Sequence, residues 1–80
     1  MIRLKLFAAV KQLVGADTLD VELAPGATVG DLRRALSTQS PQLARYVPHL
    51  MFAVNAQYAA DSTVIPADAE VACIPPVSGG

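Results

Sequence analysis

Apolar and polar residues alternate in two stretches of the first third of the chain. Residues 2–7 place Ile2, Leu4 and Leu6 on one side of an extended backbone, and residues 18–23 alternate in the same way. A period of two is typical of strands that bury one face. Between them, residues 8–14 have helical apolar spacing and are followed by a glycine, which favours a short helix. The pattern predicts a β-hairpin with an elaborated loop.

The period changes to that of a helix between residues 28 and 38. Thr28 can cap this helix, and Asp31, three residues later, completes a capping-box-like pair that also complements the helix dipole. We expect Arg33 and Arg34 to point away into solvent, although the pair could also bind an anion. The apolar stripe that faces the core is predicted to consist of Val29, Leu32, Ala35 and Leu36.

Shorter patterns fill the second half of the chain. Residues 41–47, bounded by prolines, predict a second short helix, and residues 66–69 predict a turn. Strands are expected at residues 52–54, near Tyr58 and at residues 71–74. Two strands, a helix and further strands together predict an α+β roll, in which a mixed sheet packs on one main helix.

Composition narrows the class of protein. The 80 residues suit one small domain, and 52% of them are hydrophobic. A net charge of −1 with thinly spread basic residues argues against binding to nucleic acid. No apolar run approaches the roughly 20 residues of a membrane span, and no signal peptide is evident. With Cys73 as the one cysteine, we expect a soluble, cytoplasmic domain that binds no membrane.

Catalytic side-chain constellations are missing from the sequence. His49 has no nearby carboxylate or cysteine, no His/Cys cluster has metal-ligand spacing, and no phosphate-binding loop occurs. Cys73 lies within an apolar strand pattern, so we interpret it as a small hydrophobic residue rather than a nucleophile. Asp20 and Glu22 share one predicted strand face and are interpreted as solvated. We expect no independent active site and no metal.

The last six residues, PPVSGG, offer a different kind of chemistry. The paired prolines favour an extended start, and two glycines form a slim end that could enter a narrow cleft. Extended, the segment from Pro75 to Gly80 spans about 20 Å. A frayed end would account for the glycines but not for the prolines before them. The reactive group is then the α-carboxylate of Gly80, which ATP could activate for attack by sulfur.

Four stretches of the sequence resemble those of a known protein family, and together they extend over nearly the whole chain. They are LKLFAAVKQLVG at residues 4–15, the helix at residues 28–36, AVN at residues 53–55 and EVACIPPVSGG at residues 70–80. The chain resembles the small, sulfur-carrier subunits of molybdopterin synthase, the MoaD type within the MoaD/ThiS family of ubiquitin-like sulfur carriers. One departure is Asp68, at a turn position where relatives often have glycine. Aspartate tolerates the left-handed conformation better than most residues.

The resemblance implies a β-grasp fold, with residues 1–74 as the domain and residues 75–80 as a flexible tail. It also implies a cycle in which an E1-like adenylating enzyme activates Gly80 and a sulfur donor protein converts it to a thiocarboxylate. The tail would then enter the large subunit of molybdopterin synthase and donate sulfur to precursor Z, within a heterotetramer. No cofactor is expected on this chain, because ATP and Mg²⁺ would be used by the activating partner.

Site residues follow from the same resemblance. Gly80 would be the acyl carrier, in the form of a glycyl adenylate and then a thiocarboxylate. Phe7 is a candidate for the partner-facing surface, although core packing would account for it equally well. The residues expected to line the threaded tail are Pro75, Pro76, Val77, Ser78 and Gly79.

Two alternatives stay open at this stage. The first is sulfur carriage for another pathway, such as thiazole or cysteine synthesis. The second is a ubiquitin-like protein modifier, in which a lysine amine rather than sulfur attacks the activated Gly80. Both use the same activated carboxylate, so the residues alone do not separate them.

Overall fold

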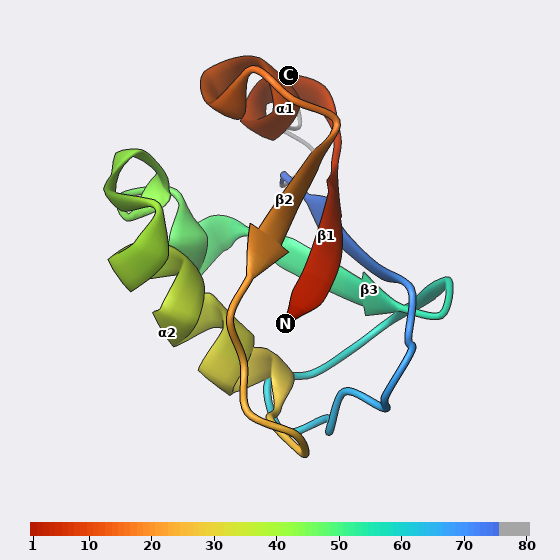
Figure 1. Cartoon of the computed structure of the whole chain (residues 1–80). Helices are drawn as coiled ribbons and strands as arrows, with labels where there is room; N and C mark the ends of the chain where they lie inside the picture. The colour runs from red at the N-terminus through yellow and green to blue at the C-terminus, as the bar shows by residue number, and fades with distance from the viewer. Residues whose placement is uncertain (76–80) are drawn as a thin grey trace.

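The computed structural model describes residues 1–75 and shows one five-stranded mixed sheet packed against a main helix (Figure 1). The strand order is β2-β1-β5-β3-β4, with β1 and β5 parallel and the other neighbours antiparallel. The predicted α+β class is confirmed. The strands are β1 (Ile2–Leu6), β2 (Thr18–Val21), β3 (Met51–Val54), β4 (Gln57–Tyr58) and β5 (Val71–Ile74).

The predicted hairpin is formed by β1 and β2, and its loop contains helix α1 (Ala8–Val14). The helix ends at Gly15, whose φ of 80° is left-handed and whose N–H donates to the carbonyl of Lys11 at 2.8 Å. Such a conformation favours glycine, because a Cβ would be strained there. The glycine therefore ends α1 where the sequence predicted, and the chain returns as β2.

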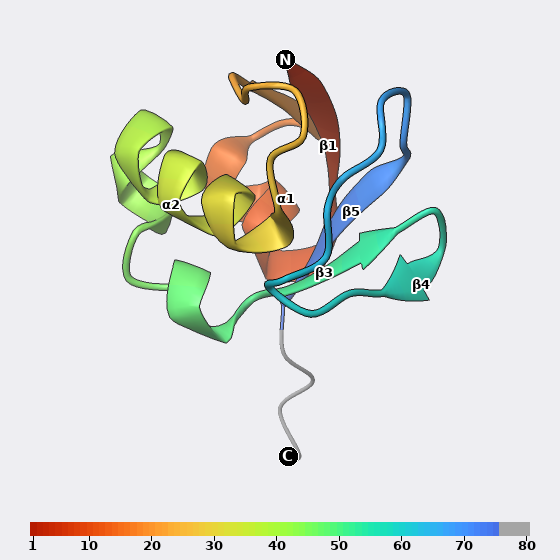
Figure 2. The same ribbon diagram turned by 90° about the horizontal axis from the view of Figure 1, so that it is seen from below.

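Helix α2 (Val29–Gln39) lies along one face of the sheet (Figure 2). Its first turn has the full capping box: the Thr28 hydroxyl accepts from the Asp31 N–H at 3.1 Å, and the Asp31 carboxylate accepts from the Thr28 N–H at 2.9 Å. These bonds satisfy amides that have no partner within the helix. The predicted stripe faces inward, with Val29, Leu32 and Leu36 buried and Ala35 packed against them.

One expectation about α2 is wrong. Arg34 is exposed, as predicted, and it pairs with Asp31 on the helix surface. Arg33 instead lies against the molecule, with a side chain only 21% exposed. Its long side chain reaches past the helix, and its Nη1 donates to the carbonyls of Val47 and Leu50. The two arginines therefore do not form a joint anion site.

The single short helix predicted for residues 41–47 is also corrected. Two 3₁₀ helices occur instead, η1 (Pro41–Leu43) and η2 (Val47–His49). A proline lies in the first turn of each, where its missing N–H costs least, and Pro48 prevents the earlier turn from continuing as one helix. Leu43 and Val47 are buried and fasten this segment to the core.

The two turns on the second half of the sheet have left-handed residues. Asn55 and Ala56, with φ of 50° and 68°, connect β3 to β4. Asp68 has a φ of 63° in the turn before β5, so this non-glycine residue does adopt the conformation that the sequence suggested. Asn55 ties the two turns together, because its side-chain oxygen accepts from the Glu70 N–H at 3.0 Å.

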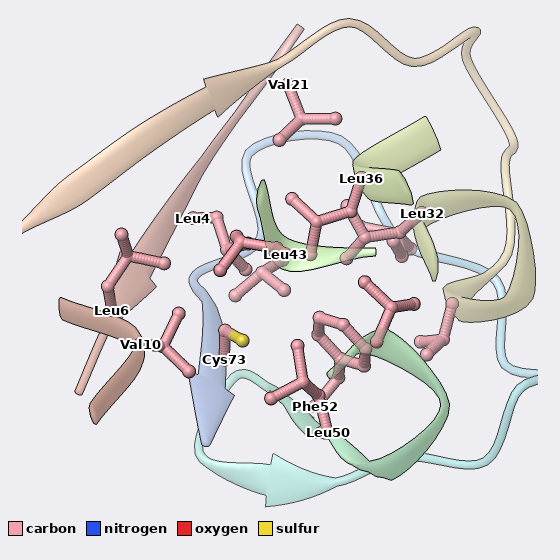
Figure 3. Packing of buried hydrophobic residues seen from close by; sticks show 14 of the residues in the cluster. Leu4, Leu6, Val10, Val21, Leu32, Leu36, Leu43, Leu50, Phe52 and Cys73 are labelled. Carbon is pink, nitrogen blue, oxygen red and sulfur yellow. The ribbon is translucent and has the colours of Figure 1, made fainter. Parts of the chain in front are cut away.

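The core lies between α2 and the inner face of the sheet (Figure 3). Leu32 and Leu36 from the helix meet Phe52 and Cys73 from the strands, and all four are at most 1% exposed. Among residues 1–75, no helix is long and apolar enough to cross a membrane.

Candidate functional site

Strand β5 carries the chain to the candidate site. It lies between β1 and β3, and the residues after it leave from the end of a central strand rather than from an edge. Pro75, the first residue of the predicted tail, is partly buried directly after this strand. The other predicted tail residues, Pro76, Val77, Ser78, Gly79 and Gly80, lie outside the described residues. The described part of the site is therefore the surface around Pro75, the root of the tail.

One apolar surface at this root lies on the outer face of the sheet. Ile74 pairs with Met51 of β3, and the β1–β5 register, which matches Leu6 with Cys73, places Phe7 beside Ile74 when continued by one residue. Phe7 is 47% exposed and Met51 is 44% exposed, and neither belongs to the core cluster. We call Phe7, Ile74 and Met51 the outer apolar row. Core packing is thereby excluded as the account of Phe7.

A strained residue fixes where Phe7 points. Phe7 keeps extended backbone angles, and Ala8 then has a φ of 52°, which is left-handed. An alanine there costs roughly 1–2 kcal/mol relative to the ordinary conformation. Because the backbone direction changes abruptly at Ala8, the extended conformation of β1 continues through Phe7 before α1 begins. The Phe7 ring therefore stays on the outer face instead of folding under the helix.

A second apolar surface lies on the other side of Pro75. It is a groove between α1 and the turn at residues 46–50, and it lies on the core side of the sheet, because Val10 in its lining belongs to the same core cluster as the buried residues of α2. Leu13 and Tyr46 are 44% and 40% exposed along it. We call this surface the tail-root groove, and it is lined chiefly by Val10, Leu13, Tyr46, His49, Leu50 and Pro75.

The remaining candidate residues do not form a catalytic group. Cys73 is fully buried, and burial raises its pKa to about 11, so the thiolate is disfavoured at neutral pH. His49 is exposed rather than packed in the core, and it lines the tail-root groove. Asp20 is on the solvent face of β2, paired with Arg3 at 3.2 Å, and Glu22 is exposed. Within residues 1–75, no group of three or more potential ligands could hold a metal.

Sequence reasoning found Phe7 but missed its neighbours in the outer apolar row. Met51 and Ile74 meet only because β3 and β5 pair antiparallel in one register, which no local pattern specifies. Leu13 and Tyr46 were missed for a similar reason, because they share a groove only where the turn at residues 46–50 lies across from α1 in the folded chain. Both lie within predicted short helices, at residues 8–14 and 41–47, and no local pattern signalled that they would line one groove.

The comparisons with known proteins agree with this architecture. A model of the ThiS family matches residues 4–80. The molybdopterin synthase sulfur carrier subunit of Dictyostelium discoideum is 36% identical over 81 residues, covering 98% of this chain and 94% of the relative. SAMP1 of Haloferax volcanii superposes with a TM-score of 0.80 at 35% identity, covering 98% of this chain and 97% of SAMP1.

A more distant structure shares the fold. It is the complex of subunits 1 and 2 of the molybdopterin-converting factor from Helicobacter pylori, at 18% identity and a TM-score of 0.66, covering 98% of this chain and 96% of that one. The solved neighbours are ubiquitin-like β-grasp proteins, so the predicted β-grasp fold is confirmed. With nearly the whole length matched by one family model, the chain belongs to the ThiS family of sulfur carriers.

Proposed function

We propose that this protein is the sulfur carrier subunit of molybdopterin synthase, with Gly80 as the residue that carries sulfur. The observation that carries the proposal is full-length similarity to a relative with that name, at 36% identity. The surface around Pro75 supports it. The central strand β5 ends at Pro75, and two exposed apolar surfaces lie beside that residue.

Gly80 would react in two steps on its activating enzyme. An oxygen of its carboxylate attacks the α-phosphate of ATP, pyrophosphate leaves, and a glycyl adenylate forms. Hydrosulfide then attacks the carbonyl carbon, AMP leaves, and the S–H proton is lost. The product is a thiocarboxylate. Glycine suits this chemistry because it has no Cβ beside the attacked carbon.

The thiocarboxylate would next donate its sulfur within the large subunit of the synthase. Precursor Z (cyclic pyranopterin monophosphate) needs two sulfurs to become the dithiolene of molybdopterin, so two carriers are consumed for each product. Once the sulfur is bonded to the precursor, water cleaves the thioester bond between Gly80 and that sulfur, which leaves the sulfur on the precursor and restores the Gly80 carboxylate. The chain is then one subunit of a heteromeric enzyme, and ATP and Mg²⁺ are used only by the activating enzyme.

The outer apolar row is the surface we assign to docking with the proteins that receive the tail. Exposed aromatic and methionine side chains are enriched in protein interfaces, and Phe7 and Met51 lie side by side with Ile74 at the tail root. The strain at Ala8 supports this assignment, because strained backbone is retained chiefly where function requires it. The Helicobacter pylori neighbour is itself a complex of subunits 1 and 2 of a molybdopterin-converting factor.

Intact mass spectrometry tests the proposal. The protein is incubated with ATP, Mg²⁺, the E1-like enzyme and sulfide, and its mass should rise by the replacement of one oxygen with one sulfur. A variant lacking Gly80 should show no gain. An unchanged wild-type mass, with the activating enzyme shown to release pyrophosphate on a known carrier, would contradict the proposal.

A second candidate function is protein modification. It is favoured by the similarity to SAMP1 of Haloferax volcanii, which is a small archaeal modifier protein, at 35% identity over 98% of this chain. Here a lysine amine of another protein attacks the activated Gly80, AMP leaves, and an isopeptide bond forms. A ladder of conjugates on anti-protein blots, lost when Gly80 is deleted, would support this candidate.

A further inference from the structure

We propose that the tail-root groove binds an apolar side chain of the large synthase subunit, presented on a segment that also carries a carboxylate. This inference rests on the proposed function and adds a second docking surface to the outer apolar row. It concerns the side of the molecule that α1 and η2 form, rather than the outer face of the sheet.

The groove has the shape and composition to receive an apolar group. Leu13 from α1 and Tyr46 from the turn before η2 stand partly exposed on its walls, and Val10 and Leu50 form buried parts of its lining. Exposed apolar residues that gather around a hollow are typical of interaction sites, whereas isolated ones are common on any surface. An occupant would cover Leu13 and Tyr46 together.

Continuity with the tail indicates which protein supplies the occupant. Pro75 lines the groove, and the next residue begins the segment that the partner must take in. A stable protein interface covers about 800 Å² on each partner. The three side chains of the outer apolar row fall well short of that area, whereas the row and the groove together surround Pro75. A stable complex with the large synthase subunit therefore needs both surfaces, whereas the transient complex with the activating enzyme does not.

The charge around the groove indicates the chemistry of the occupant. Its lining contains no acidic residue. Arg45 is exposed one residue before Tyr46, and it is the one lysine or arginine of residues 1–75 that makes no ion pair with a carboxylate. His49 adds a second basic group to the lining. A partner segment with a carboxylate beside its apolar side chain would complement this rim.

The test measures binding of the large subunit to the full-length protein by titration calorimetry. Leu13→Glu should weaken the affinity by more than about ten-fold, as expected for a central apolar contact. Arg45→Glu should weaken it as well and should flatten its dependence on salt, because it removes the attractive charge. Val64→Glu is the matched control, since Val64 is 54% exposed, lies outside the groove and should leave binding unchanged.

Each variant is also assayed for thiocarboxylate formation by the activating enzyme, and its melting temperature is recorded. All three variants should be activated at the wild-type rate. Unchanged binding of the folded Arg45→Glu and Leu13→Glu proteins would overturn the proposal while leaving the sulfur-carrier function intact. Impaired activation with normal large-subunit binding would also overturn it, and would assign the groove to the activating enzyme. A wild-type protein that is never thiocarboxylated would overturn both.

Discussion

The guanidinium group of Arg33 lies over the ring of Phe52, with 5.0 Å between the guanidinium carbon and the ring centroid. From this position its Nη1 donates to the carbonyls of Val47 and Leu50 at 2.6 and 2.9 Å. Its Nη2 donates to the Asp61 carboxylate at 2.9 Å. One side chain of α2 thus holds η2 and a later loop against the sheet, and η2 forms one wall of the tail-root groove.

Arg33→Ala should therefore destabilise the fold by about 1–3 kcal/mol, because the carbonyls of Val47 and Leu50 each lose a donor in a partly buried position. Arg34→Ala is the matched control. Arg34 is the next residue, but its side chain is 75% exposed and its pair with Asp31 lies on the surface. Its loss should cost less than about 1 kcal/mol. Urea denaturation of the two variants makes the comparison, and equal losses would contradict the role assigned to Arg33.

The burial of the Cys73 thiol predicts that the free energy of unfolding decreases at alkaline pH. Burial raises its pKa from the ordinary value of 9.0 to about 11 in the folded protein. The unfolded chain therefore releases the thiol proton first as pH rises. The contribution of the Cys73 thiol to the free energy of unfolding should be constant below pH 9.0 and should be lost progressively toward pH 11. The difference between wild type and Cys73→Ala isolates this effect, and a difference that does not change with pH would show that the thiol is not desolvated.

Ala56 offers a substitution that should stabilise the protein. Its φ of 68°, together with the φ of 50° at Asn55, makes this a two-residue hairpin turn in which glycine is preferred at the second position. Ala56→Gly should raise the free energy of unfolding by about 0.5–1 kcal/mol, since relief of strain exceeds the added entropy of the unfolded chain. Ala60→Gly, at an exposed position without positive φ, should give no gain. Equal changes in the free energy of unfolding for the two substitutions would show that the left-handed conformation of Ala56 is not strained.

Deleting Gly79 and Gly80 should separate function from stability. The deletion should abolish thiocarboxylate formation, because the proposed acyl group is gone. The described core cluster ends at Cys73, so the free energy of unfolding should change by less than about 0.5 kcal/mol. A variant with one alanine added after Gly80 keeps both glycines and should be equally inactive. A large loss of stability on deletion would show that these residues pack against the domain.

The elements that the sequence predicted well have local causes. The capping box at Thr28 and the glycine after α1 are decided within a few residues, so the bounds of both helices were close to those observed. The alternation at residues 2–7 likewise placed Leu4 on the buried face of its strand, and the apolar run at residues 71–74 marked Cys73 as a hydrophobic residue rather than a nucleophile; both are buried.

The misjudged features depend on contacts between distant parts of the chain. Arg33 was assigned to solvent because helical periodicity places it on the polar side, yet its partners lie 14, 17 and 28 residues away. The outer apolar row and the tail-root groove could not be predicted from the sequence for the same reason. They arise from strand register and from the packing of η2, neither of which a single stretch of sequence encodes.

A single-turnover experiment tests the central claim most directly. Thiocarboxylated protein is mixed with the large subunit and precursor Z, and the mass of the carrier is followed together with formation of molybdopterin. We expect the carrier to return to its carboxylate form only when precursor Z is present, with two carriers consumed for each molybdopterin. A thiocarboxylate that persists in the complete mixture, with a large subunit shown to be active with another carrier, would contradict the account.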